Sequence, residues 1–192
     1  IGDHSFSALA GFVASRYVGE SANSSIRGFS DNKIHSMNAG TVLNKPSEDY
    51  GASTNASVLG RVTYDYQNKY LATVNFRADG SSKFGVNNRW GYFPSFSLGW
   101  RLTGEEFMKP LDWLSDLKLR VGWGQVGNDQ VGYYSSYGIY GIGANYNMDG
   151  IILPGDYQSQ IGNDKLRWER TTQTNVGLDF SFLNGRMTLT AD

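Results

Sequence analysis

Apolar and polar residues alternate one by one through long stretches of this 192-residue chain. Between positions 55 and 66 the even positions are small, apolar or aromatic, and the odd positions are polar except for Leu59. Positions 70–79 repeat the pattern, with Leu71 as the one apolar residue on the polar side. Successive side chains of a β-strand point to opposite faces, so this period of two predicts strands with one apolar and one polar face.

Five further segments have the same alternation, and we therefore predict about seven strands. The apolar positions in these five segments are Phe6, Ala8, Ala10 and Phe12; Trp90, Tyr92, Phe96, Leu98 and Trp100; Leu117, Leu119, Val121 and Trp123; Trp168, Val176, Leu178 and Phe180; and Met187, Leu189 and Ala191. Pro94 falls inside one segment and predicts a local bulge there, because proline cannot donate to a strand ladder.

The length of these segments separates a membrane barrel from a soluble sheet. Strands of soluble proteins usually have about 5–6 residues, whereas a tilted strand needs about 9–11 to cross a bilayer. No run of 18 apolar residues is present, which excludes a helical span. The pattern predicts an all-β fold, an antiparallel transmembrane β-barrel, with residues 1–192 as one partial barrel domain.

The predicted connections alternate between short and long. Residues 67–69 and 183–185 form tight turns, and Asn184-Gly185 suits a type I′ turn because both residues tolerate positive φ. Residues 103–115 form a medium link with room for a helical turn, and residues 19–54, 80–90 and 127–165 form long connections. Short turns at one end and long loops at the other are typical of outer-membrane barrels, with the long loops outside the cell.

Aromatic residues gather toward the ends of the predicted strands. Trp90 and Trp100 share a face ten residues apart, which is roughly 33 Å along a strand. A tilt near 45° brings this to about 23 Å of membrane height, close to the apolar band of about 25 Å that aromatic girdles flank. The predicted girdle residues are Tyr64, Tyr66, Tyr70, Trp90, Tyr92, Trp100, Trp123 and Trp168.

Three longer motifs resemble hallmarks of the SusC/RagA-type TonB-dependent outer-membrane transporters. They are NRWGYFPSFSLGWRL at 88–102, LKLRVGWGQVGN at 117–128, and LRWE at 166–169 leading to TQTNVGLD at 172–179. The resemblance covers residues 55–192 well and the first 54 residues loosely, and it identifies the chain as part of the barrel of such a transporter.

The resemblance implies a 22-stranded barrel with a plug domain ahead of it in the sequence. It also implies a SusD-like surface lipoprotein that lids the barrel and captures a glycan or peptide, and TonB, which pulls on the plug to admit the substrate. This chain contains no recognisable plug or TonB-contact segment, so we expect it to be a piece of a longer polypeptide. The expected location is the outer membrane of a Gram-negative cell, with several strands in contact with lipid.

The segment from Val131 to Tyr157 is rich in tyrosine, glycine and asparagine. A tyrosine presents an apolar ring and a hydroxyl, which suits stacking on sugars or gripping a peptide. The candidate contacts with substrate or lid protein are Tyr133, Tyr134, Tyr137, Tyr140, Tyr146 and Tyr157. The alternative is that these tyrosines pack the loop on itself or on a lid protein. The loop near Asp31, Asn32, Lys33 and Asp49 is expected to be solvated.

Several other function classes are disfavoured. A net charge of −1 argues against nucleic-acid binding. The chain has no Cys, and neither His4 nor His35 has neighbours at metal-ligand spacing. The G-x-G-x-x-G run at 122–127 precedes loop-like residues, whereas a dinucleotide site needs a helix there. No G-x-S-x-G motif is present. We therefore expect no enzyme, cofactor or metal.

The leading function is part of a nutrient importer. The alternatives are a passive or structural, porin-like barrel and a soluble all-β carbohydrate-binding domain.

Overall fold

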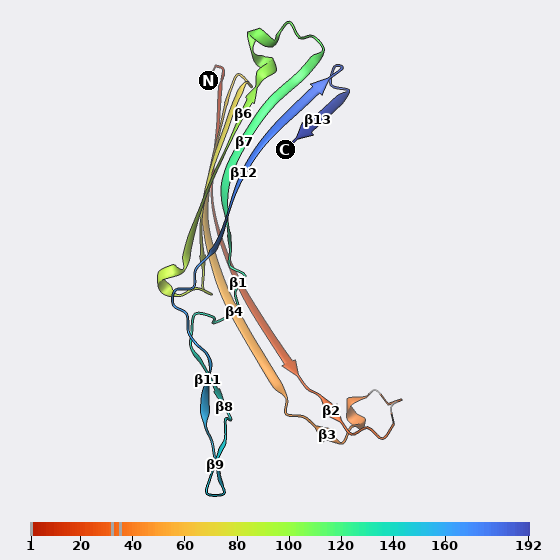
Figure 1. The fold of residues 1–192 in the computed structure, drawn as a ribbon, viewed down its shortest axis with the longest axis vertical. Helices are drawn as coiled ribbons and strands as arrows, with labels where there is room; N and C mark the ends of the chain where they lie inside the picture. Colours follow the sequence, from red (N-terminus) through yellow and green to blue (C-terminus); the bar gives the residue numbers. More distant parts are fainter. Residues whose placement is uncertain (1, 32, 35) are drawn as a thin grey trace.

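The centre of the computed structural model is one seven-stranded antiparallel sheet (Figure 1). The structure describes residues 2–31, 33–34 and 36–192. The sheet has the order β1-β4-β5-β6-β7-β12-β13. Its strands are β1 (His4–Asn23), β4 (Ser47–Tyr66), β5 (Tyr70–Ser81), β6 (Trp90–Arg101), β7 (Leu114–Asn128), β12 (Glu169–Phe182) and β13 (Met187–Ala191). The prediction of seven antiparallel strands is confirmed, and six of the seven have 12 or more residues.

The register converts the alternation in the sequence into two faces of different chemistry. Val74 of β5 is opposite Val62 of β4 and Phe96 of β6, and Phe96 is opposite Trp123 of β7. The next residue, Asn75, is opposite Arg61 and Ser95. Residues directly opposite each other project from the same side of a sheet. The sheet therefore has an apolar face, which carries Val74, and a polar face, which carries Asn75.

No second layer built from the described residues covers the apolar face. Val74 is 57% exposed and Leu98 is 54% exposed. Among the described residues the buried apolar side chains are Phe84, Phe93 and Leu114. A soluble sandwich buries one face of each sheet against another sheet, and the part of the chain that the structure describes leaves the apolar face of its large sheet exposed. The architecture argues against the soluble all-β alternative.

The connections leave the two ends of the sheet in the predicted alternation (Figure 1). One end carries the turn after β4, the link between β6 and β7, and the turn after β12. The φ angles of Gln67 (53°), Asn68 (55°), Asn184 (56°) and Gly185 (79°) are all positive, as type I′ turn chemistry requires. The link contains the 3₁₀ turns η3 (Leu102–Gly104) and η4 (Glu106–Met108), in agreement with the expected helical turn.

The opposite end carries the three long connections. The first and the third contain strands that were not predicted. The first contains β2 (Ile26–Arg27), η1 (Met37–Ala39) and β3 (Val42–Leu43), and the second contains η2 (Val86–Asn88). The third contains β8 (Ile139–Ile142), β9 (Tyr146–Met148), β10 (Ile151–Leu153) and β11 (Asp156–Gln160). In it, β11 pairs with β8 and β10 pairs with β9. These pairs form a narrow ribbon, residues 139–160, that projects beyond the sheet (Figure 1).

Three sequence-based expectations need correction. The connection predicted at 19–54 is shorter, because β1 and β4 stay paired as far as Asn23 and Ser47. The outer parts of these two strands pair through their backbones, and their sequences lack the alternation that would have predicted a strand. The long connection at 127–165 contains strands. The ladder between β5 and β6 runs through Pro94 without a register shift. Pro94 lies instead where the pairing of β6 with β7 stops, since that ladder reaches only to Ser95.

None of the helical turns in the described residues is long and apolar enough to cross a membrane.

Candidate functional site: a polar face and a tyrosine ribbon

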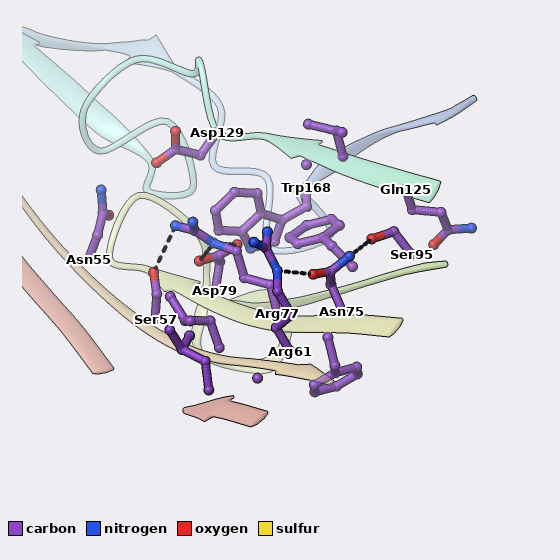
Figure 2. A pocket seen from close by; sticks show the side chains of 17 residues that line it. Asn55, Ser57, Arg61, Asn75, Arg77, Asp79, Ser95, Gln125, Asp129 and Trp168 are labelled. Atoms are coloured by element: carbon purple, nitrogen blue, oxygen red, sulfur yellow. Dashed lines mark hydrogen bonds and ion pairs between the residues drawn. The ribbon is translucent and has the colours of Figure 1, made fainter. Parts of the chain in front are cut away.

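A groove of about 740 Å³ runs along the polar face of the sheet (Figure 2). Strands β4, β5 and β6 position most of its polar side chains, because every second residue of each strand projects to this side. The labelled residues that line the groove are Asn55, Ser57, Arg61, Asn75, Arg77, Asp79, Ser95, Gln125, Asp129 and Trp168.

Two hydrogen-bonded chains cross the groove from strand to strand (Figure 2). In the first, Arg61 Nε donates to Asn75 Oδ1 at 2.6 Å, and Asn75 Nδ2 donates to Ser95 Oγ at 3.1 Å. In the second, Arg77 Nε lies 2.7 Å from both carboxylate oxygens of Asp79, and its terminal nitrogen donates to Ser57 Oγ at 3.3 Å. The polar face is therefore a bonded network and not a set of independent charges.

A second polar cluster lies on the same face nearer the tight turns. Arg120 of β7 forms two hydrogen bonds with Asp179 of β12, at 2.8 and 3.0 Å, and a third with Asp192 at 3.0 Å. Arg120 and Asp192 line a second groove of about 480 Å³ together with Thr73, Lys118 and Asn175. Bidentate pairing of arginine with a carboxylate fixes both side chains.

Trp168 lies apart from the other predicted girdle residues. Its Nε1 donates to the carbonyl of Arg89 at 3.0 Å, and its ring packs 5.3 Å from that of Phe84 and 5.5 Å from that of Phe93. It lines the polar groove, so its side chain is on the polar side of the sheet. The expectation that Trp168 faces lipid is therefore corrected. Trp168 directly precedes β12, where the strand pattern no longer fixes the direction of a side chain.

The other seven predicted girdle residues belong to strands β4 to β7 and follow the apolar pattern. At the tight-turn end, the rings of Tyr66 and Tyr70 are 6.2 Å apart, and those of Tyr70 and Trp100 are 6.4 Å apart. Tyr64 lies beside Phe6 in the same row. Farther along the sheet are Trp90, Tyr92 and Trp123. Tyr92 stacks on Phe76, and Trp123 stacks on Phe96. Contact of these residues with lipid stays a prediction.

The six predicted contact tyrosines lie in or next to the ribbon, and all are exposed. Tyr140 is 69% exposed, and Tyr137, Tyr157 and Tyr146 are 56%, 54% and 53% exposed. Gln160 Nε2 donates to the carbonyls of Tyr134 and Tyr137, at 3.1 and 2.9 Å, and so holds the base of the ribbon. Tyr140, Tyr146 and Tyr157 lie on the projecting ribbon itself, and Tyr133, Tyr134 and Tyr137 lie in the segment just before it.

Tyr133 is attached to the sheet. Its ring stacks on Tyr17 at 6.2 Å with an interplanar angle of 2°, and Lys83 Nζ lies 5.6 Å from the ring centre. A Cβ at Gly51 would overlap the ring, so glycine makes this approach possible. Partial desolvation raises the pKa of the Tyr133 hydroxyl above its ordinary value of 10.0, and the neighbouring Tyr17 adds to the effect. Tyr133 therefore attaches the segment that leads into the ribbon to β1 and β4.

The glycine-rich run and His4, two possible binding motifs in the sequence, lie in strands. Residues 122–127 lie within β7, and a Cβ at Gly127 would overlap the ring of Phe93, so that glycine leaves room for a neighbour. His4 Nδ1 lies 2.9 Å from the Tyr64 hydroxyl. The expectations for Asn32 and His35 lie outside the described residues.

The polar network was not predicted from the sequence. The available signal was Arg77 and Asp79, two opposite charges at strand spacing on the polar side. The hydrogen bonds of Asn75 with Arg61 and Ser95 could not be predicted without knowing the register of the strands.

A single layer of long antiparallel strands with two chemically opposite faces is a portion of β-barrel wall. The comparison with known families agrees: residues 3–192 match the model of the TonB-dependent receptor-like β-barrel. The chain belongs to this family.

The relatives and solved structures are consistent with that assignment. The chain is 37% identical to TonB-dependent receptor P39 of Formosa agariphila over 98% of its length, and 44% identical to TonB-dependent receptor SusC of Bacteroides thetaiotaomicron over 71% of its length. It superimposes on a structure of the RagAB peptide transporter with a TM-score of 0.85 and 28% identity over 99% of its length. It spans only 18%, 14% and 21% of these three longer chains.

Proposed function

We propose that this chain forms part of the barrel wall of a TonB-dependent importer in the outer membrane of a Gram-negative cell. The observation that carries the proposal is the two-faced single sheet, in which Val74 and Phe96 are exposed on one side while Arg61, Asn75 and Ser95 are hydrogen-bonded on the other. In a barrel of this kind the apolar face contacts lipid and the polar face lines the interior. The seven aromatic residues of β4 to β7 form the interfacial girdles.

The transported substrate is proposed to be a glycan or a peptide, delivered by a SusD-like lipoprotein on the cell surface. A similar solved structure is that of a peptide transporter, which supports the peptide as a substrate. The tyrosine ribbon supports contact with such a substrate or with the lipoprotein. Its rings are exposed on the end of the sheet that carries the long connections, which is the outer end in such barrels.

Trimming the ribbon tests this role. The backbone N–H groups of Gly143 and Ala144 both donate to the carbonyl of Gly155, so the two sides of the ribbon meet there. Deleting residues 144–154 joins Gly143 to Gly155 and leaves a two-residue Gly-Gly turn between Ile142 and Asp156, which are already paired. Such turns close hairpins readily. The sheet and the base of the ribbon are therefore expected to assemble normally.

We expect the trimmed full-length protein to reach the outer membrane at normal levels and to take up its glycan or peptide poorly. Replacing Tyr140 and Tyr157 by serine keeps the ribbon at full length and removes two exposed rings that the trimmed protein retains, and it should also reduce uptake. Normal uptake in both variants would refute a role of the ribbon in capture. The matched control is Tyr17→Phe, which keeps the ring that stacks on Tyr133 and should leave uptake unchanged.

A passive, porin-like barrel is the second candidate, and energy dependence separates it from an importer. Uptake by an importer should stop in a strain without TonB, because the plug cannot be pulled. A passive barrel would continue to admit its solute. Uptake that persists without TonB would overturn the importer proposal while leaving the barrel assignment intact.

A further inference from the structure

The link between β6 and β7, residues 102–113, carries large apolar side chains that are exposed. Phe107 and Trp113 are each 63% exposed, and Leu111 is 38% exposed. Single exposed apolar residues are ordinary on protein surfaces. Three within seven positions of one link form a concentrated patch.

Glu105 attaches the link to the aromatic row of Tyr66, Tyr70 and Trp100 on the apolar face. Its Oε1 accepts hydrogen bonds from the Tyr70 hydroxyl at 2.7 Å and from Trp100 Nε1 at 3.2 Å. Lys69 Nζ lies 3.7 Å from Oε2, and the Glu105 side chain is 17% exposed. Tyr70 and Trp100 are cross-strand partners with stacked rings. The carboxylate therefore places the start of the link against the face that we propose to contact lipid.

Asp116 holds the link from its other side. It accepts a hydrogen bond from Thr103 Oγ1 at 2.9 Å and lies 3.3 Å from Arg101 Nε. Between these attachments the backbone turns tightly. The N–H groups of Met108, Leu111 and Leu114 donate to the backbone carbonyls of Glu105, Met108 and Leu111, respectively. The link is thus a fixed platform beside the aromatic row.

We propose that residues 106–113 form an interfacial membrane anchor. Phe107, Leu111 and Trp113 insert among the headgroups and upper acyl chains of the periplasmic leaflet, while Lys109 and Asp112 stay in water. The proposal rests on the proposed function, because it requires the apolar face to contact lipid.

The choice of lipid as the occupant follows from the attachment of Glu105, two residues before Phe107, to Tyr70 and Trp100 of that face. Aromatic residues favour the membrane interface, where one end of the ring is apolar and the other wet. A lysine at such a place extends its ammonium group into water while its methylenes cover apolar surface.

The depth of single labelled positions tests the anchor. Residues 1–192 contain no Cys, so Phe107→Cys, Trp113→Cys and Asp112→Cys each give one labelling site in this region of the full-length protein. Each variant carries an NBD label and is reconstituted into phosphatidylethanolamine and phosphatidylglycerol vesicles with brominated acyl chains. Only preparations that show heat-modifiable, folded barrel are compared, and any native Cys elsewhere in the protein is first replaced by serine.

We expect the brominated lipid to quench labels at positions 107 and 113 about threefold more than the label at 112, since interfacial segments insert about 5–10 Å. Equal, weak quenching at all three positions, with free access to aqueous iodide, would overturn the anchor. That outcome would leave a protein partner as the occupant of the patch. In a double variant that adds Glu105→Ala to Phe107→Cys, quenching of the label at 107 should fall toward the value for the label at 112.

A label at Val74→Cys makes failure of the anchor distinguishable from failure of the proposed function. Strong quenching at 74 with weak quenching at 107 and 113 would refute the anchor alone. Weak quenching at 74 would refute the lipid-facing assignment of the sheet itself.

Discussion

Arg77 and Asp79, two residues apart on strand β5, form an ion pair in which Arg77 Nε is 2.7 Å from both carboxylate oxygens. The period of a strand puts both side chains on the polar face. The two partners differ in environment, because the Asp79 side chain is 12% exposed and that of Arg77 is 54% exposed. The arginine therefore serves to compensate a largely buried carboxylate.

Replacing Arg77 by methionine should destabilise the folded barrel by about 1 kcal/mol, because it leaves Asp79 buried without its partner while the solvent exposure of the arginine limits the loss. Arg61→Met is the matched control on the same face, since Arg61 donates to the neutral Asn75, and a smaller loss is expected. Urea unfolding of the full-length protein in detergent measures both. Equal losses would contradict the argument.

The second prediction concerns the two faces of β5. Val74 and Thr73 are neighbours, and Thr73 is opposite Thr63 and Ser97 on the polar face. Arginine on the lipid face near the midplane costs about 2–4 kcal/mol, and the same change facing a wet interior costs far less. Val74→Arg should therefore reduce assembled barrel much more than Thr73→Arg in outer-membrane fractions.

Thr73 is a cleaner control than Asn75, because Asn75 bridges Arg61 and Ser95 and its replacement also breaks that chain. Heat-modifiable folded protein is the readout, since a change on the polar face can alter uptake without altering assembly. A greater loss for Thr73→Arg would mean that the two faces are reversed.

The third prediction concerns residues 1–192 expressed alone. Strands β1 and β13 each pair on one side only in this sheet, and β1 has 20 residues. Unpaired backbone groups along such an edge are costly in hydrocarbon and promote aggregation in water. The isolated chain should aggregate in plain buffer. A monomer with reversible, cooperative unfolding in the absence of detergent would be the opposite result.

The fourth prediction follows from the carboxylate of Glu105. Hydrogen bonds from Tyr70 and then Trp100 hold the pKa of Glu105 below its ordinary value of 4.5. A carboxyl group with a lowered folded-state pKa stabilises the folded state above its unfolded pKa, and that contribution is lost as pH falls through the folded-state pKa. Attachment of the link to the sheet should therefore be complete at neutral pH and weaken in acid below 4.5.

An NBD label at Phe107→Cys measures this attachment as pH is lowered. Glu105→Gln is the control, since it keeps the side-chain volume and has no charge to lose in this range. The acid-induced change in fluorescence should be smaller in that variant. An identical response in both proteins would assign the change to another group.

The sequence by itself determined the seven strands, their two faces and the tight turns. Val74 and Asn75 point to opposite faces because adjacent residues of any strand do so, whatever the partner strand. Asn184-Gly185 closes its turn because both residues accept positive φ. These outcomes depend on local geometry, which the order of residues already contains.

Only the tertiary structure decided the contacts between distant residues. Trp168 packs on Phe84 and Phe93 and bonds to Arg89, which is 79 positions away. Glu105 meets Tyr70 across 35 positions, and the pairing of β8 with β11 orders a segment that shows no strand alternation. Such contacts form because the register of the sheet brings particular side chains and backbone groups together, and the local sequence pattern specifies only which face each strand residue occupies.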